Sequence, residues 1–203
     1  MPLAIFGGTF DPVHNAHIAV ARAARDTFRL DRILLIPAAV PPHKQDRLGA
    51  PYPDRLAMVQ LACRDEPAIE ASDLEAGAGN SYSILTILEV RQHLGPDARL
   101  LFLIGADAFS EIRTWHRWTE VVAAVEFIVV TRPGHEYTVP QGASVLELDR
   151  VQMNVSSSHI REKLARCEPP PELSEAVFEY IREHRLYGFG SACESDPDFV
   201  VKR

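Results

Sequence analysis

Short apolar runs alternate along this chain with stretches whose apolar residues recur every three or four positions. The run at residues 3–6 predicts a buried strand, and the apolar stripe from Ile18 to Phe28 predicts the helix that follows it. A second apolar run at residues 33–36 predicts a parallel neighbour of the first strand. Strand, helix and strand in this order form a β-α-β unit, which predicts a parallel sheet.

The alternation continues through the rest of the chain. Further helices are expected over residues 54–63, 84–94 and 172–184 and from Ser156 onward, and further strands near residue 69 and over residues 100–104, 127–130 and 145–148. Residues 37–53 hold five prolines and predict a long loop. The pattern favours an α/β fold, a doubly wound parallel sheet of the Rossmann type with a small C-terminal helical part. We expect one domain over residues 1–187 and a tail over residues 188–203.

Composition limits the classes of partner. The chain has 203 residues, a net charge of −7 and a hydrophobic fraction of 46%. A negative net charge argues against a nucleic-acid footprint spread over a broad surface, although cations that converge on one site can still bind an anion. No apolar stretch reaches the length of a membrane span. We therefore expect a cytoplasmic protein without nucleic-acid or membrane partners, and leave its oligomeric state open.

The segment from Gly7 to His17, GGTFDPVHNAH, carries the most information about chemistry. Glycines after a buried strand let backbone N–H groups approach an anion, and a helix that begins there adds unpaired N–H groups and the positive end of its dipole. Asp11 is expected to cap this helix, with Pro12 in its first turn. His14 lies three residues before His17, so both imidazoles share one face of the opening turn. Together these features predict a phosphate site.

Other interpretations of this segment compete. The glycines can serve only a tight turn, and a single histidine is more often a surface or core residue than a catalytic one. The histidine pair can also ligate zinc, but the sequence offers no third ligand at a matching spacing. The segment contains neither a Walker loop nor the dinucleotide-binding glycine pattern.

A second candidate phosphate site lies late in the chain, in the stretch VSSSHIRE that includes Ser157, Ser158 and Arg161. Hydroxyls and an arginine at a helix N-terminus suit the outer phosphates of a triphosphate. Taken alone, such a stretch is more often a helix cap and a solvated charge.

The two stretches together resemble the nucleotidylyltransferase superfamily. The first is similar to the (H/T)-x-G-H pattern in the form typical of nicotinate-nucleotide adenylyltransferases, with Ala16 where that family usually has glycine. The second is similar to the family's I-S-S-T-x-I-R motif, with Ser158 in place of threonine. The resemblance covers about residues 3–187.

Intermediate stretches also resemble this family. VPPHK, with His43 and Lys44, is similar to the family's loop over the phosphates. NSYS, with Ser83, is similar to a family stretch near the acceptor. IGAD, with Gly105 and Asp107, is similar to a family stretch beside adenosine. TWH resembles a stretch whose tryptophan, here Trp115, stacks on the nicotinate ring. Without the resemblance, Lys44 is a solvated charge, Ser83 and Asp107 are helix caps, and Trp115 is a core residue.

The resemblance implies adenylyl transfer from ATP to nicotinate mononucleotide, with Mg²⁺ as the cofactor. Mg²⁺ is held by the triphosphate, so no protein metal ligands are expected. Positive charge for the reaction is expected from Mg²⁺ and the catalytic residues. The ATP-binding and acceptor-binding residues are expected to contact the two nucleotides. The expected catalytic residues are His14, His17, Lys44 and Arg161, the ATP-binding residues are Gly7, Gly8, Thr9, Phe10, Gly105, Asp107, Ser157 and Ser158, and the acceptor-binding residues are His43, Ser83 and Trp115.

Alternatives to this function remain. Sibling transferases act on nicotinamide mononucleotide, phosphopantetheine or glycerol phosphate. From other classes, a nucleotide-binding regulator without catalysis and a zinc hydrolase that uses the histidine pair are the competing interpretations.

Overall fold

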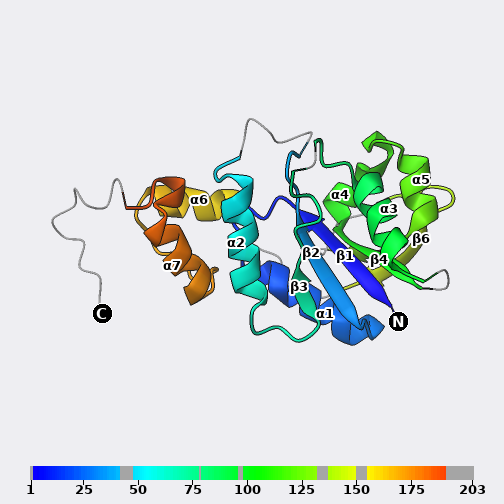
Figure 1. The fold of residues 1–203 in the computed structure, drawn as a ribbon, viewed down its shortest axis with the longest axis horizontal. Helices are drawn as coiled ribbons and strands as arrows, with labels where there is room; N and C mark the ends of the chain where they lie inside the picture. The colour runs from blue at the N-terminus through cyan, green and yellow to red at the C-terminus, as the bar shows by residue number, and fades with distance from the viewer. Residues whose placement is uncertain are drawn as a thin grey trace.

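A computed structural model of the chain describes residues 2–41, 48–77, 79–95, 98–131, 137–149 and 155–190. Its centre is a six-stranded, wholly parallel sheet in the order β3-β2-β1-β4-β5-β6 (Figure 1). The strands are β1 (Leu3–Gly8), β2 (Arg32–Pro37), β3 (Ile69–Ala71), β4 (Leu100–Gly105), β5 (Glu126–Val130) and β6 (Ser144–Leu148). The predicted doubly wound sheet is therefore confirmed. Its strand order reverses between β1 and β4, and such a switch point opens a crevice beyond the carboxyl ends of the strands.

Helices cover both faces of this sheet. They are α1 (Asn15–Phe28), α2 (Tyr52–Cys63), α3 (Ser83–His93), α4 (Ala106–Ser110), α5 (Trp118–Ala124), α6 (Ser157–Ala165) and α7 (Glu175–Glu183), with the short 3-10 helices η2 (Ile112–Thr114) and η3 (Leu186–Gly188). In Figure 1, α3, α4 and α5 gather at one side of the molecule and α6 and α7 at the opposite end, beyond α2. Phe189, which follows η3, is buried against Phe178 of α7.

Two apolar cores follow from the alternation of side chains along each strand. Ala4 and Phe6 of β1 pack into the core shared with α1, α2, α6 and α7. Leu3 and Ile5, on the opposite face of the same strand, pack into the core shared with α3, α4 and α5. Because successive side chains of a strand point to opposite faces, a fully apolar run is what a strand covered on both faces requires.

The structure differs from the sequence predictions at several helices. The helices α4 and α5 were not predicted, because five and seven residues are too few to display a helical period. Helix α7 begins at Glu175 instead of residue 172, because the hydroxyl of Ser174 accepts the N–H of Val177 and caps it there.

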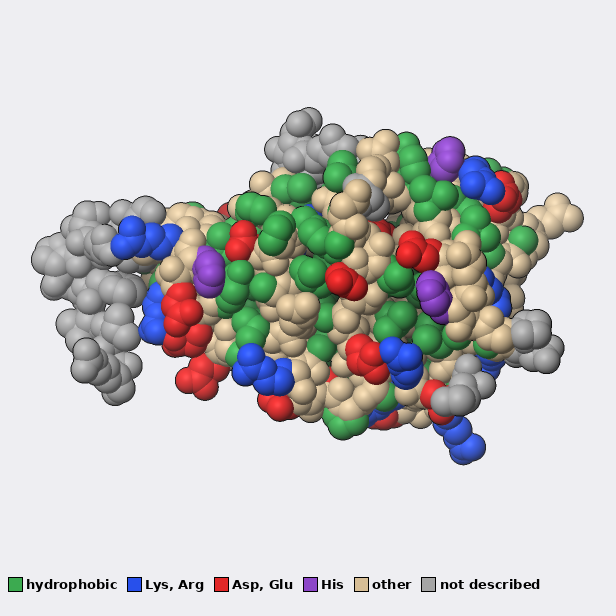
Figure 2. Space-filling view, viewed as in Figure 1, with side chains coloured by type: hydrophobic (Ala, Val, Ile, Leu, Met, Phe, Trp, Pro, Cys, Tyr) green, Lys and Arg blue, Asp and Glu red, His purple; other side chains and the backbone are tan. Residues whose placement is uncertain are grey.

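The distribution of charge on the surface is relevant to the expectation that the protein has no nucleic-acid partner. On the face shown in Figure 2, acidic and basic side chains lie interspersed, without one broad basic patch. Among the residues that the structure describes, no helix is both long enough and apolar enough to cross a membrane.

A buried arginine holds the loops at the carboxyl ends of β1 and β2. Arg55 of α2 has no exposed surface, and its guanidinium donates hydrogen bonds to three backbone carbonyls. The acceptors are the oxygens of Thr9 at 2.7 Å, Ala39 at 3.3 Å and Ala50 at 3.2 Å. Burial lowers the pKa of Arg55, but a guanidinium stays charged throughout the working range of pH. One cation therefore connects three segments that meet at the edge of the sheet.

This arrangement predicts a large loss of stability in Arg55→Met. The variant leaves three buried carbonyls without a donor, so we expect the free energy of unfolding to fall by about 3–5 kcal/mol. Urea denaturation measures the change. The matched control is Arg64→Met, which alters an exposed arginine at the end of the same helix and should cost less than about 0.5 kcal/mol. Similar losses in the two variants would contradict this role of Arg55.

Candidate functional site

The first turn after β1 has a different geometry from the predicted one. Helix α1 begins at Asn15 with His14 as its N-cap residue, so the prediction that Asp11 caps the helix is wrong, and Pro12 lies before the helix. The backbone of Phe10 is left-handed, with a φ of 49°, which is rare for an aromatic residue. Its ring packs over Gly8, where an added Cβ would lie 3.0 Å from the ring. Glycine at position 8 therefore leaves room for the ring of Phe10, which would have to shift to admit a side chain there.

His14 and His17 lie together, as their spacing predicted. Their rings are stacked with centroids 3.7 Å apart, and the backbone N–H of His14 donates to Nδ1 of His17 at 3.2 Å. The ring of His17 also contacts the edges of Phe6 and Phe10. Since Nδ1 of His17 accepts, a neutral ring carries its proton on Nε2. The sequence therefore predicted the pairing, while the aromatic packing that holds His17 came from the fold.

Both histidines are uncharged in the free protein near pH 7. Burial lowers the pKa of His14 to about 4, and the negative charge of Glu172 offsets this only in part. Burial also lowers the pKa of His17 well below its usual value, with a further lowering by His14. The rings thus offer N–H donors instead of the positive charge that the sequence led us to expect.

The N-terminus of α1 offers fewer unpaired N–H groups than predicted. The N–H of Asn15 donates to the carbonyl of Glu172 at 2.9 Å, and the N–H of His17 donates to the carbonyl of His14 at 2.9 Å. In contrast, Nδ1 of His14 is buried and has no hydrogen-bond partner among the described residues. Leaving a buried polar atom without a partner costs free energy.

The late motif lies directly against the first one. Ser157 donates from its hydroxyl to the carbonyl of Pro12 at 2.9 Å, and Nη1 of Arg161 donates to the carbonyl of Asp11 at 2.6 Å. The cap of α6 is Ser156, whose hydroxyl accepts the N–H of His159. The two motifs, about 150 positions apart in the chain, therefore lie in direct contact with each other.

A cavity of about 390 Å³ opens between the two motifs. Its lining combines both stretches with the end of the proline-rich loop: Thr9, Asp11, Leu48, Ser156, Ser157, Ser158 and Arg161. The hydroxyls and the guanidinium are the groups that suit phosphate oxygens.

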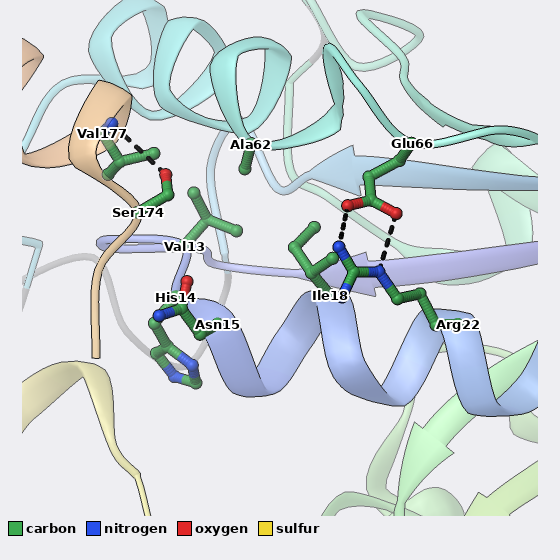
Figure 3. Close-up of a pocket in the computed structure, with 9 residues that line it drawn as sticks. All are labelled: Val13, His14, Asn15, Ile18, Arg22, Ala62, Glu66, Ser174 and Val177. Carbon is green, nitrogen blue, oxygen red and sulfur yellow. Dashed lines mark hydrogen bonds and ion pairs between the residues drawn. The ribbon is translucent and has the colours of Figure 1, made fainter. Parts of the chain in front are cut away.

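A smaller cavity of about 150 Å³ lies on the other side of the start of α1, between α1, α2 and α7. Figure 3 shows Val13, Ile18 and Ser174 around it, with the ion pair of Arg22 and Glu66 at one end. The imidazole of His14 points away from this cavity in Figure 3. His14 nevertheless belongs to the lining of the smaller cavity, whereas His17 is not among the described residues that line it.

The remaining predicted residues lie near the carboxyl ends of neighbouring strands or outside the described ranges. Gly105 ends β4, beside β1, with open space where a side chain would lie, and the exposed Asp107 is in the first turn of α4. Trp115 is half-buried against the edge of Phe102, whose ring would lie 3.5 Å from a Cβ added at Gly7.

Ser83, His43 and Lys44 are the last of the predicted site residues. Ser83 is the first residue of α3, and the loop before it is joined to the turn after β2 through Ser81 and Val40. His43 and Lys44 lie outside the described residues.

Sequence reasoning missed three residues of this region, Arg55, Gly49 and Tyr187. Arg55 stands on a predicted helix, where an arginine is ordinarily a solvated charge. Gly49 lies in a loop, and Tyr187 is the last residue of the expected domain. Nothing in their local sequence marks them, because their contacts are with segments far away in the chain.

The lowered pKa values predict how stability depends on pH. Unfolded His14 binds a proton near pH 6.5, but in the folded protein its pKa is about 4, so the unfolded state binds more protons between these values. Stability is then complete above about pH 6.5 and falls as the pH is lowered. We expect a loss of about 2 kcal/mol between pH 7.5 and pH 5 from this group.

Urea denaturation at the two pH values measures this loss. His14→Gln should reduce it, whereas His93→Gln, at an exposed histidine, should retain it. An unchanged pH dependence in His14→Gln would show that His14 is not its source.

Known proteins are similar to this chain in sequence along most of its length. Residues 5–163 match the family model described as cytidylyltransferase-like. A protein of Solibacter usitatus named "Probable nicotinate-nucleotide adenylyltransferase" is 55% identical over 187 residues, which cover 92% of this chain and 100% of that protein. A protein of the same name from Citrifermentans bemidjiense is 39% identical, with 92% of this chain and 98% of that protein covered.

Solved structures show the same fold. The Plasmodium falciparum nicotinic acid mononucleotide adenylyltransferase complexed with NaAD superposes with a TM-score of 0.77 at 19% identity, covering 94% of this chain and 98% of that chain. At this identity the likeness concerns the fold alone, whereas the curated relatives are similar in sequence along nearly their whole length. The chain belongs to the cytidylyltransferase-like family and, within it, to the nicotinate-nucleotide adenylyltransferases.

Proposed function

We propose that the protein transfers the adenylyl group of ATP to nicotinate mononucleotide, forming nicotinate adenine dinucleotide and pyrophosphate. The main support for the proposal is that the two motifs lie against each other at the switch point of the sheet. Ser157 contacts Pro12 there, and Arg161 contacts Asp11. The names of the relatives support the choice of acceptor.

The reaction has a simple balance of bonds. An oxygen of the acceptor's phosphate attacks the α-phosphorus of ATP and forms the new P–O bond, and the bond from that phosphorus to the bridging oxygen of pyrophosphate breaks. The nucleophile is already an anion, so no strong general base is required. Catalysis then consists of positioning the two nucleotides and stabilising the charge that develops.

His17 and His14 supply the donors near the α-phosphate in this proposal. Nδ1 of His17 accepts the backbone N–H of His14, which leaves Nε2 as the donating atom, and Phe6 and Phe10 restrict the ring. A donor that is fixed before the substrate arrives needs little reorganisation during the reaction. The approach of a triphosphate raises the pKa of both rings, because an anion favours their protonated forms.

Arg161, Ser157 and Ser158 are assigned to the outer phosphates, around the larger cavity. Gly7, Gly8, Thr9 and Phe10 form the turn beneath the phosphates, and Gly105 and Asp107 lie beside the adenosine. Lys44 completes the set of cations. With two neutral histidines, permanent positive charge in this site comes from the arginine and the lysine.

Mg²⁺ is expected to arrive with the triphosphate. Within the described ranges, His, Cys, Asp and Glu side chains form no group of three or more that can hold a metal ion. Mg²⁺ is commonly bound through substrate phosphates and water, which fits a site built from hydroxyls and an arginine. The stacked rings of His14 and His17 are only 24° from parallel, so their ring-plane lone pairs do not converge on one ion, which disfavours the zinc hydrolase.

The acceptor is assigned to His43, Ser83 and Trp115. Trp115 lies near the carboxyl end of β1 through Phe102, and its indole face suits the cationic pyridinium ring of the acceptor. A cytoplasmic location is part of the proposal, because ATP is a substrate.

The first prediction from this function concerns acceptor choice. Nicotinate mononucleotide should be preferred over nicotinamide mononucleotide by at least about tenfold in kcat/KM, or about 1.4 kcal/mol of transition-state binding. Pyrophosphate release from ATP, measured with a panel of acceptor mononucleotides, gives this ratio. Equal rates or a preference for the amide would overturn the choice of acceptor, and no turnover with any acceptor would overturn the reaction itself.

The second prediction concerns His17. Removing one positioned donor costs about 10²–10³ in kcat, so His17→Ala should lose activity to this extent while ATP binding weakens far less. The matched control is His93→Ala, at an exposed histidine of α3, which should leave kcat unchanged. Thermal denaturation on the same preparations checks that the fold persists. If His17→Ala keeps more than about a third of the wild-type kcat, His17 has no catalytic role.

A further inference from the structure

The carboxylate of Asp11 receives contacts from three other segments of the chain, although only 3% of the residue is exposed. Its Oδ2 accepts the N–H of Gly49 at 2.7 Å, and its Oδ1 accepts the N–H of Ala50 at 3.1 Å and the hydroxyl of Tyr187 at 2.8 Å. Nη1 of Arg161 lies 3.6 Å from Oδ2. A buried carboxylate with this many donors is strongly fixed in place.

Arg161 is held from the protein side by the same group of residues. Nη1 donates to the backbone oxygen of Asp11 at 2.6 Å, and the aliphatic part of the side chain packs on Gly49, where an added Cβ would lie 2.7 Å from Cδ. The side chain is 25% exposed and lines the larger cavity. The guanidinium therefore has a defined position before any ligand binds.

Tyr187 supports Asp11 from η3, at the far end of the described chain. Its backbone is left-handed, with a φ of 57°, a conformation that a bulky residue adopts only when its surroundings impose it. Burial and the charge of Asp11 raise the pKa of the phenol, so it stays protonated and donates to the carboxylate. The described residues that line the larger cavity do not include Tyr187. Any effect of this residue on a ligand must therefore pass through Asp11 and its neighbours.

We propose that Tyr187 and Asp11 are positioning residues that orient Arg161 toward the triphosphate. Tyr187 fixes the carboxylate of Asp11, which in turn fixes the guanidinium of Arg161 and the backbone at Gly49 and Ala50. The inference rests on the proposed function, since it assigns the triphosphate as the ligand of Arg161. It makes the C-terminal turn a part of the ATP site.

The test compares two tyrosine variants. Tyr187→Phe should lower kcat/KM for ATP by about three- to tenfold, the range expected for one hydrogen bond, with the KM for nicotinate mononucleotide within about twofold of wild type. The matched control is Tyr180→Phe, which removes a similar tyrosine–aspartate hydrogen bond, of 2.9 Å to Asp54, between α7 and α2. It should change neither constant by more than about twofold. Equal effects of the two variants would overturn the proposal.

A double-mutant cycle with Arg161→Ala separates positioning from general destabilisation. If Tyr187 acts through Arg161, Tyr187→Phe should lower kcat/KM for ATP by less than about twofold in the Arg161→Ala background. A purely structural effect would give the same fold-loss in both backgrounds, and this outcome would overturn the proposal.

Gly49→Ala provides an independent variant if Tyr187→Phe fails to fold. Its new methyl group would press on Cδ of Arg161 and on the ring of Tyr187, both 2.7 Å from the added Cβ, without removing a hydrogen bond. It should give the same selective loss in kcat/KM for ATP. A folded Gly49→Ala with wild-type constants would overturn the proposal.

Binding of a non-hydrolysable ATP analogue, measured by calorimetry, separates this inference from the proposed function. Wild-type protein that binds the analogue but forms no dinucleotide would refute the proposed function. In that case, weaker binding by Tyr187→Phe than by Tyr180→Phe would still support the positioning role, and equal binding would overturn it.

Discussion

The guanidinium of Arg55 is placed among the carbonyls of Thr9, Ala39 and Ala50, with no exposed surface. These three segments are the turn after β1, the turn after β2 and the end of the proline-rich loop. Loops carry backbone polar groups that cannot remain unpaired when buried, so a cation with several donors allows them to meet inside the protein. The shape of the edge of the sheet, and with it the site, depends on this arginine.

The site itself depends on a second buried group of opposite charge. Asp11 lies between the two motifs and receives donors from the loop at Gly49 and Ala50, from α6 and from η3. Closing such long loops costs conformational entropy, which the contacts of α6 and α7 with the same apolar core as α1 and α2 offset. The C-terminal helices are therefore part of the core that supports the first turn, as well as a cover for it.

Electrostatics in this site combine neutral and charged groups. The stacked His14 and His17 are buried enough to stay neutral in the free protein, whereas the group that Arg161 holds against Asp11 is a guanidinium. Neutral donors can be packed against Phe6 and Phe10 without the desolvation cost of two adjacent cations. An acidic protein can in this way bind a highly charged substrate, because a guanidinium and neutral N–H donors lie close together although the net charge is −7.

The sequence by itself determined the order of the main strands and helices, because apolar runs and helical stripes are local signals, and it identified the two motifs. It did not predict α4 and α5, which are too short to display a period, and it assigned Asp11 to a helix cap because that residue type most often has this role near a helix start. Only the tertiary structure decided that Gly49, Arg55 and Tyr187 contact the first motif, at Asp11 and Thr9. Their partners are up to 176 positions away, and a hydrogen bond between distant residues leaves no pattern in the local sequence.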